Sequence, residues 1–549
     1  MSRHVLVATA VFLISCNAPS DKTPPVDGPP AATASSAGFG QHLHPIRTTN
    51  AAAQKAFDEG VALVFGFNHE EAVRSFARAA ELDPQSPMPH WGIAWALGPN
   101  YNLDIDDPRA AQASDEIRKA AVLAADGSPE ERAYIDALKV RYSPDPKADR
   151  PALAAAYSKA MGALVRQYPD DLDAATLYAE SLMNLRPWKL WSLDGTPAPG
   201  TDEIVRVLES VLARNPDHMG ANHYYIHATE ASRTPSRALP SAKRLETLAP
   251  AAGHLVHMPA HVYARTGDHA GAARANEAGA EADRAYLEAA PPNGFYGMAY
   301  YSHNLHFLAD SEMMQGRFAK AKQAADQLAQ HLGPHAAMMP MVESMIVMPT
   351  SVLLRFGKYD DILALDAPSA GRPVMTAWWH FARGVAFAAK GDGDAARAER
   401  AALAPATALV PESALFGGTG LESAKAILAL AGTVLDARIA AARGARTEAI
   451  TLWQRAVAAG DRVAYDEPPV WFYPLRESLG AALLTAGRAA DAERVYRDDL
   501  DRHPRNGRSL FGLHQSLVAQ KKDADAAWVK RAFDDAWQFA DSTLSIDEL

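Results

Sequence analysis

Histidine is concentrated in one stretch of this chain. The protein has 549 residues and 19 histidines, and nine of these lie among the 89 residues from 218 to 306, where an even distribution would place about three. Imidazole is the commonest metal-ligating side chain, and two histidines spaced i, i+4 on a helix present their nitrogens on one face. The stretch therefore predicts a site whose chemistry depends on imidazole.

The histidines of this stretch repeat in register. His223 and His227 are followed 34 residues later by His257 and His261, and the spacing within each pair is about one helical turn. A further histidine lies one turn before the second pair, and a third segment carries an i, i+3 pair. The seven candidate metal ligands are His223, His227, His254, His257, His261, His303 and His306.

Oxygen-bearing side chains on the same segments are candidates to orient the rings. A metal-ligating imidazole usually donates its second ring N–H to a nearby acceptor. Four side chains are expected to fill that role: Asn222, Glu230, Asn304 and Asp310. Glu230 and Asp310 are also the candidates for a general base if the site is catalytic.

The elements that must position these residues are predicted to be helices. The segment from 51 to 84 resembles a tetratricopeptide repeat (TPR), a 34-residue unit of two antiparallel helices. With Pro84 at position 32 of that unit, Gly60, Ala72 and Ala79 fall at positions 8, 20 and 27, where the repeat keeps small residues. The same pattern returns in patches over most of 45–535, and alternation typical of strands is sparse.

The resemblance implies an all-α fold, a TPR-type right-handed α-α superhelix (solenoid) in which the first helix of each repeat lines a concave groove. The 34-residue interval between the histidine pairs equals one repeat. In that register all seven histidines fall at positions 2, 5 and 9 of the first helix, which face the groove in TPRs. The resemblance therefore implies one cluster of imidazoles in the groove.

Several chemistries stay open for such a cluster. A metal that prefers nitrogen is favoured, copper or zinc before iron, bound as one ion with three or four ligands or as a dinuclear site. The protein then either binds the metal or uses it as an oxidase or hydrolase. Alternatively, the groove binds a peptide or a partner protein without metal. The ligand count separates binding from catalysis, because a closed four-ligand site indicates structure or storage and an open position indicates catalysis.

Two local features bear on the site. Pro259 lies between His257 and His261, inside the expected helix, where proline removes a hydrogen bond and costs about 3 kcal/mol. Violations of local rules of this kind concentrate at functional positions. The acidic and aromatic run 466–477 is a candidate cap for the groove, but the sequence does not establish that it reaches the histidines.

The N-terminus predicts export. Arg3 precedes an apolar run of about ten residues, too short to span a bilayer of about 30 Å as a helix. The run ends in the sequence LISC, which resembles the bacterial lipobox, and the resemblance implies that Cys16 is lipidated. We therefore expect a membrane-anchored lipoprotein, periplasmic or on the cell surface, and Asn17 after the cysteine favours the outer membrane.

Composition excludes several classes of function. One cysteine excludes a disulfide framework, a CxxC redox pair and a multi-cysteine zinc site. The net charge of −11 argues against nucleic acid as a partner, because phosphate binding needs a basic face. No phosphate-binding loop, nucleophile motif or dinucleotide fingerprint is present, so catalysis without a metal is not expected.

The expected organisation is a signal peptide (1–15), a disordered Pro/Ala/Ser-rich tether (16–40), N-terminal TPR-like helices (41–170), central repeats with the histidine cluster (171–335) and C-terminal TPR-like repeats (336–549). As a whole, the chain resembles a group of exported bacterial TPR lipoproteins that share phrases such as HYYIHATE and YYSHNLHF. That resemblance implies the fold and export, and it carries no activity.

Overall fold

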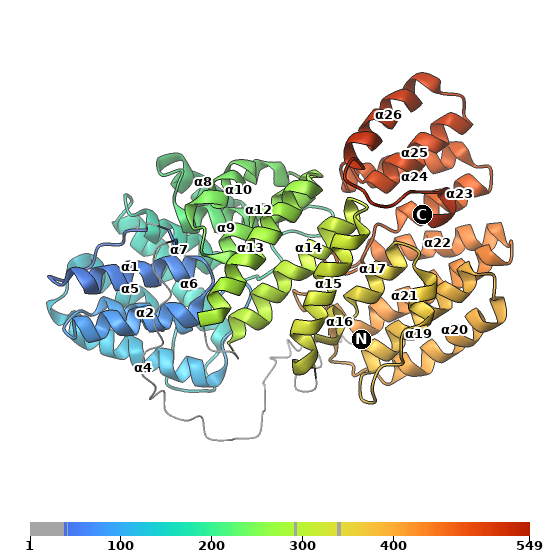
Figure 1. Ribbon diagram of the computed structural model, residues 1–549. Helices are drawn as coiled ribbons and strands as arrows, with labels where there is room; N and C mark the ends of the chain where they lie inside the picture. The colour runs from blue at the N-terminus through green and yellow to red at the C-terminus, as the bar shows by residue number, and fades with distance from the viewer. Residues whose placement is uncertain (1–37, 41, 290–293, 337–341) are drawn as a thin grey trace, which may run out of the picture.

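The computed structural model describes residues 38–40, 42–289, 294–336 and 342–549. Over this part of the chain the protein is all-α, and consecutive helices pack beside one another in antiparallel pairs (Figure 1). This is a TPR-like architecture, and it confirms the predicted fold class. Within the described ranges, no helix is both long enough and apolar enough to cross a membrane.

The helices follow one another with short connections. The first eight are α1 (Ala51–Phe65), α2 (His69–Leu82), α3 (Met88–Leu97), α4 (Asp107–Leu123), α5 (Pro129–Lys139), α6 (Arg150–Gln167), α7 (Leu172–Met183) and α8 (Thr201–Arg214). The next nine are α9 (Met219–Thr229), α10 (Leu239–Leu248), α11 (Gly253–His257), α12 (Pro259–Thr266), α13 (His269–Ala289), α14 (Ser302–Met314), α15 (Phe318–Leu332), α16 (Glu343–Ile346) and α17 (Met348–Arg355).

The C-terminal part continues the same pattern. Its helices are α18 (Tyr359–Leu363), α19 (Pro373–Ala389), α20 (Gly393–Ala408), α21 (Ala424–Ala442), α22 (Arg446–Gly460), α23 (Arg476–Thr485), α24 (Ala489–Arg502), α25 (Gly507–Ala519) and α26 (Asp523–Ala536). Short 3₁₀ turns cover Ala124–Asp126, Pro235–Ala238, Gly333–His335 and Ile546–Glu548. A small antiparallel hairpin, β1 (Leu415–Phe416) and β2 (Glu422–Ser423), was not expected from the sequence.

Small residues let paired helices approach closely. A Cβ atom added to Gly60 of α1 would lie 2.5 Å from a ring carbon of Phe76 on α2. Gly480 of α23 has the same relation to Tyr496 of α24, at 2.4 Å. Both contacts are far below van der Waals separation, so a larger residue would force the helices apart. This explains why the repeat pattern keeps a small residue at this position.

Two irregular helical segments lie in the histidine-rich region. The helix expected to run through Pro259 is broken: α11 ends at His257 and α12 begins at Pro259, because proline has no N–H to donate to the preceding turn. A π-helical turn, Gly297–Tyr301, leads directly into α14. Turns of this type are rare and occur often at functional sites.

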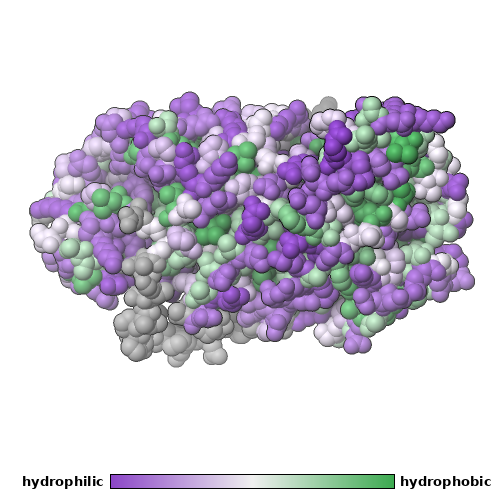
Figure 2. All heavy atoms as spheres, turned by 45° about the horizontal axis from the view of Figure 1, so that its top comes forward, coloured by the Kyte–Doolittle hydropathy of each residue, from purple (hydrophilic) through white to green (hydrophobic). Residues whose placement is uncertain are grey.

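The buried apolar residues form two large cores. One core runs from Phe39 to Phe307 and the other from Ala280 to Leu549. In Figure 1 these are the blue-to-green half and the yellow-to-red half, which meet around α13, α14 and α15. The face shown in Figure 2 is mostly hydrophilic, with apolar side chains scattered in small groups.

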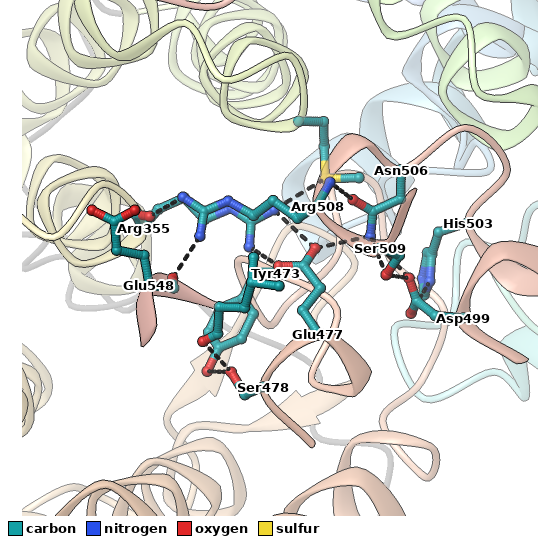
Figure 3. Close-up of polar contacts among 12 residues, drawn as sticks. Arg355, Tyr473, Glu477, Ser478, Asp499, His503, Asn506, Arg508, Ser509 and Glu548 are labelled. Atoms are coloured by element: carbon teal, nitrogen blue, oxygen red, sulfur yellow. Dashed lines mark hydrogen bonds and ion pairs between the residues drawn. The ribbon is translucent and has the colours of Figure 1, made fainter. Parts of the chain in front are cut away.

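A buried charged network joins the last repeats to α17 (Figure 3). The guanidinium of Arg355 donates to both carboxylate oxygens of Glu477, one of them at 2.9 Å. Asn506 donates to the same carboxylate at 2.8 Å, and Arg508 donates to the backbone carbonyl of Arg355. Arg355 is 5% exposed and Glu477 is fully buried, so these opposite charges neutralise each other inside the C-terminal half.

The predicted signal peptide and the lipidation site Cys16 lie outside the described residues, as does most of the predicted tether. Its last residues, 38–40, are packed against the protein: the carbonyl of Gly38 accepts a hydrogen bond from the N–H of Ala251 at 2.9 Å, and Phe39 is buried. Residues 42–48, here called the N-terminal arm, follow and lead to the first helix.

Candidate metal centre

Six of the seven predicted ligands come together, and they are enclosed in the protein. Helix α9 supplies His223 and His227, α11 supplies His254 and His257, α12 supplies His261 and α14 supplies His303. The first five are at most 2% exposed, and the last is partly exposed. The imidazoles are therefore buried between helices, whereas the TPR register had placed them in an open concave groove.

Three of these histidines form the first triad: His223, His227 and His254. One ring nitrogen from each lies within 4.8 Å of the other two. The Nε2 atoms of His223 and His254 are 3.1 Å apart, and Nε2 of His227 is buried without a hydrogen-bond partner. The three nitrogens therefore face a common point.

The second triad is His257, His261 and His303, again with one ring nitrogen from each within 4.8 Å of the others. Nε2 of His257 lies 2.8 Å from Nε2 of His261 and 3.1 Å from Nε2 of His303. The two triads adjoin, because the ring centroids of His227 and His261 are 5.5 Å apart and those of His254 and His257 are 5.4 Å apart. The histidines thus form a pair of three-nitrogen sites side by side.

Glu230 connects the two triads. It follows α9, is 1% exposed, and places one carboxylate oxygen 2.9 Å from Nδ1 of His227 and the other 2.5 Å from Nδ1 of His261. This is the orienting role that the sequence predicted for Glu230. Because one carboxylate holds a ring of each triad, a change at this residue affects both sites.

Two other acceptors hold rings from outside, and sequence reasoning missed both. Nδ1 of His223 donates to the backbone carbonyl of Phe65 at 2.6 Å, and Nδ1 of His257 donates to Oδ1 of Asn276 at 2.7 Å. Each of these bonds keeps the proton on Nδ1 and turns the Nε2 lone pair inward. A backbone carbonyl has no sequence signal, and Asn276 lies on α13, outside the histidine-bearing helices.

Electrostatics keeps most of the rings neutral. Burial, reinforced by neighbouring imidazoles, holds the pKa values of His223, His254, His257 and His303 well below their usual range. Burial also lowers the pKa of His227, although Glu230 opposes it. His261 differs: burial would lower its pKa, but the Glu230 carboxylate overcomes that effect and raises it. Neutral imidazole is the form that binds metals.

Glu230 itself is held ionised. Burial alone would raise its pKa, but the imidazoles of His261 and His227 bring it down to about 2. A carboxylate with so low a pKa and with both oxygens engaged by rings is a poor general base. The geometry therefore supports Glu230 as an orienting group rather than as the base that the sequence had suggested.

Several predicted residues do not join the centre. His306 is on α14 but belongs to neither triad, and burial lowers its pKa to about 4. Burial raises the pKa of Asp310 to about 7, and the charges that influence it are Arg355 and His503 rather than triad members. Asn222 donates to the backbone carbonyls of Pro216 and His218, and Asn304 donates to Asp283. The amide groups of Asn222 and Asn304 therefore donate to groups other than the triad rings.

Aromatic side chains in strained conformations seal the first triad. Phe67, in the turn between α1 and α2, has φ of 57°, and its ring lies 4.5 Å from that of His223 and 5.3 Å from that of His254. Trp188 has φ of 59° and contacts the ring of His227 at 5.7 Å. A left-handed backbone is costly for bulky residues and marks functional positions when it occurs.

A loop from the C-terminal half reaches the second triad. Tyr465 donates a hydrogen bond to Glu467, and the guanidinium of Arg265 lies over the Tyr465 ring at 5.6 Å while its Nε donates to the carbonyl of Glu230. Glu467 is 4% exposed and influences the charge of His261. Burial raises the pKa of Glu467 to about 8, so this carboxyl is neutral at physiological pH. The candidate cap in the sequence therefore does approach the histidines.

The solved structures that the chain resembles are helical. Human IFIT1, as a dimer with m7Gppp-AAAA, is 12% identical over 89% of this chain and 91% of that chain, with a TM-score of 0.34. Yeast Tom70 is 11% identical over 87% of this chain and 98% of that chain, also with a TM-score of 0.34. No family model and no curated protein matches the chain. The TPR-like description rests on the paired helices of this chain, and nothing about its ligands follows from these similarities.

Proposed function

We propose that this protein binds two ions of a nitrogen-preferring metal, copper or zinc before iron, one in each histidine triad. The observation that carries the proposal is the orientation of the rings. Nδ1 of His223, His227 and His257 donates outward to an oxygen acceptor, and Nε2 of His223 and of His257 lies within 3.1 Å of an Nε2 atom of its own triad. Imidazole nitrogens suit copper, zinc and iron.

The closest contact between rings is not a hydrogen bond between neutral imidazoles. His257 and His261 both direct an Nδ1 proton outward, toward Asn276 and Glu230, so their Nε2 atoms, 2.8 Å apart, are both acceptors while the rings are neutral. A metal cation between these nitrogens converts the repulsion into coordination, and without one a second proton on His261, whose pKa is raised, bridges them. Zinc–nitrogen bonds of about 2.0 Å in tetrahedral geometry separate the ligand nitrogens by about 3.3 Å, close to the observed spacing.

The coordination favours an enzyme over a storage protein. Three protein ligands on an ion leave a fourth position for water or substrate, as in catalytic zinc sites. The second triad has the partly exposed ligand His303, and the neutral carboxyl of Glu467 lies within electrostatic reach of it. We place substrate at this triad. The metal sets the reaction class, with hydrolysis for zinc and oxidation for copper or iron.

Peptide or partner-protein binding without metal is the second candidate, and the repeat fold alone supports it. Export and lipid anchoring through Cys16 also belong to the proposal, on the support of residues 1–17 of the sequence. A Cys16→Ala variant that still sediments with membranes would contradict the anchor. A partner recovered equally well with and without metal would favour the scaffold.

Metal content tests the central proposal. The protein is purified without a histidine tag, reconstituted separately with Zn²⁺ and Cu²⁺, and analysed for bound metal. We expect two equivalents, of which His227→Ala removes one and His261→Ala the other. His514→Ala, which removes an imidazole outside the centre, is the matched control and should keep both. Failure of the wild type to hold either metal in stoichiometric amount would overturn the proposal.

A further inference from the structure

A second histidine cluster lies at the N-terminal arm, away from the triads. The carboxylate of Asp173, on α7, contacts three imidazoles. Its Oδ1 lies 2.9 Å from Nε2 of His42 and 3.1 Å from Nε2 of His218, and its Oδ2 lies 2.6 Å from Nδ1 of His44. All four side chains are at most 12% exposed. Two of the histidines are on the arm, so Asp173 fixes the arm to the helical body.

The chemistry of this cluster differs from that of the triads. Nδ1 of His218 accepts a hydrogen bond from the N–H of Ala221 at the start of α9, so the ring carries its proton on Nε2, facing Asp173. A protonated nitrogen cannot ligate a metal. The imidazoles therefore act as N–H donors to a carboxylate. Burial would raise the pKa of Asp173, but the three imidazoles hold it well below its usual range.

The rest of the arm is held by hydrogen bonds and by apolar packing, since Ile46 is buried and the ring of His44 packs against Phe57, Trp91 and Tyr134. Backbone N–H groups of His44, Ile46 and Arg47 donate to side chains of Asp58, Gln54 and Glu131, at 2.9, 3.0 and 2.7 Å. A cavity of about 450 Å³ runs along the cluster and is lined by both arm histidines and by Asp173. The cavity thus borders the contacts that fix the arm to the helical body.

Phe65, the last residue of α1, connects the arm to the first triad. Its ring packs edge-on against His42 and His218, with centroids 5.1 and 5.7 Å away. Its backbone carbonyl accepts the hydrogen bond from Nδ1 of His223. Phe65 therefore contacts the arm through its side chain and a histidine of the first triad through its backbone carbonyl. No comparable contact between the arm and the second triad occurs among the described residues.

We propose that the docked arm positions the first triad, so that Asp173 and the arm histidines control retention of the first metal ion and leave the second unaffected. Asp173 and His42 are positioning residues, acting on His223 through Phe65. Orienting groups of this kind typically change metal affinity 10- to 100-fold. The inference rests on the proposed metal function and adds a control to one of its two sites.

The test measures Zn²⁺ dissociation into a chelator from the reconstituted full chain, together with hydrogen exchange of the arm. Two backgrounds isolate the ions: His303→Ala retains the first and His227→Ala retains the second. We expect Asp173→Asn to speed exchange in the arm and to accelerate loss of the first ion at least 10-fold, with loss of the second unchanged. The double variant His42→Gln/His44→Gln, confined to the arm, should reproduce the result if Asp173→Asn fails to fold.

The matched control is His90→Gln. It removes another half-buried histidine–carboxylate contact of the same half, the 2.6 Å pair with Glu116, and should change neither rate. The inference would be overturned if the amide hydrogens of the arm exchanged faster while the first ion still dissociated at the wild-type rate. It would also be overturned if the dissociation of both ions were accelerated equally. Absence of bound Zn²⁺ in the wild type would instead contradict the metal proposal itself, so the two failures are distinguishable.

Discussion

Two of the buried polar clusters described above, the histidine centre in the N-terminal half and the network around Glu477 in the C-terminal half, are built on opposite rules. In the C-terminal cluster of Figure 3, Arg355 meets Glu477, and the amide of Asn506 donates to the same carboxylate. In the histidine centre, ring nitrogens face ring nitrogens instead of opposite charges. Burial is common to both. The convergence of ring nitrogens is the feature that the proposed metal function explains and that the C-terminal cluster lacks.

The difference has an energetic basis. A buried ion pair between two residues of the chain needs nothing further, because each charge is compensated within the fold. In the histidine centre, the outward hydrogen bonds of His223 and His257 keep their Nε2 lone pairs facing inward, where the proposed cation would ligate them. The C-terminal cluster should therefore depend on its own residues, and the histidine centre on an added cation. Four predictions test this contrast.

Metal removal should have the largest effect. A ligand present at a thousand times its Kd stabilises the folded state by about 4 kcal/mol per site. We therefore expect a chelator to lower the unfolding free energy of the N-terminal half by several kcal/mol, measured by urea denaturation with and without Zn²⁺. Identical denaturation curves would remove the distinction between the clusters.

Breaking the C-terminal pair should be nearly as severe and independent of metal. Glu477→Gln leaves Arg355 charged, buried and unpaired, which typically costs about 3–5 kcal/mol. Chemical denaturation should show the loss, and metal content should stay at the wild-type level. Asp534→Asn, which breaks an exposed pair with Lys530, is the control and should change stability by less than about 1 kcal/mol. Loss of metal from Glu477→Gln would show that the clusters are coupled.

Glu230→Gln should weaken both metal sites together. The substitution keeps the shape but removes the charge that holds rings of both triads, and we expect a 10- to 100-fold loss of affinity at each site. Competition titration with a calibrated chelator measures both constants. An effect confined to one ion would mean that the carboxylate serves only one triad.

The smallest predicted effect concerns pH in the metal-free protein. The folded-state pKa of His254 lies well below its unfolded value near 6.5. Unfolded chains therefore bind a proton that folded chains do not, and stability is lost as the pH falls below 6.5. His254→Gln should abolish this contribution, so that its acid loss at pH 5.5 is smaller than that of the wild type by about 1.4 kcal/mol. Parallel pH profiles for the two proteins would contradict the assignment.

The sequence predicted the helices and most of the histidines that converge, because both depend on the periodicity of helices and repeats. The 34-residue interval between His223 and His257 matched the observed relation between α9 and α11, and the i, i+3 spacing correctly placed Glu230 beside His227. The same reasoning placed all seven histidines in one groove, as ligands of a single ion or of a dinuclear site. The structure brings six of them into two adjoining triads, and His254 and His257, one turn apart on α11, belong to different triads.

The remaining features lack a local signal. The carbonyl of Phe65 is 158 positions from His223 in sequence, and Glu467 comes from a loop in the other half of the molecule. Asn222 and Asn304 lie on the expected helices, but backbone carbonyls and Asp283 take their amide hydrogens. Contacts of this kind depend on how repeats stack, which periodicity alone does not determine.

The sealing of the first triad bears on how an ion at the proposed site would exchange. With its rings at most 2% exposed and capped by Phe67 and Trp188, local opening of the surrounding elements must precede entry or release of an ion. Reconstitution of the purified protein is therefore expected to fill the first triad slowly and the second, whose His303 is partly exposed, faster. The order of filling would then report on the cap rather than on the ligands.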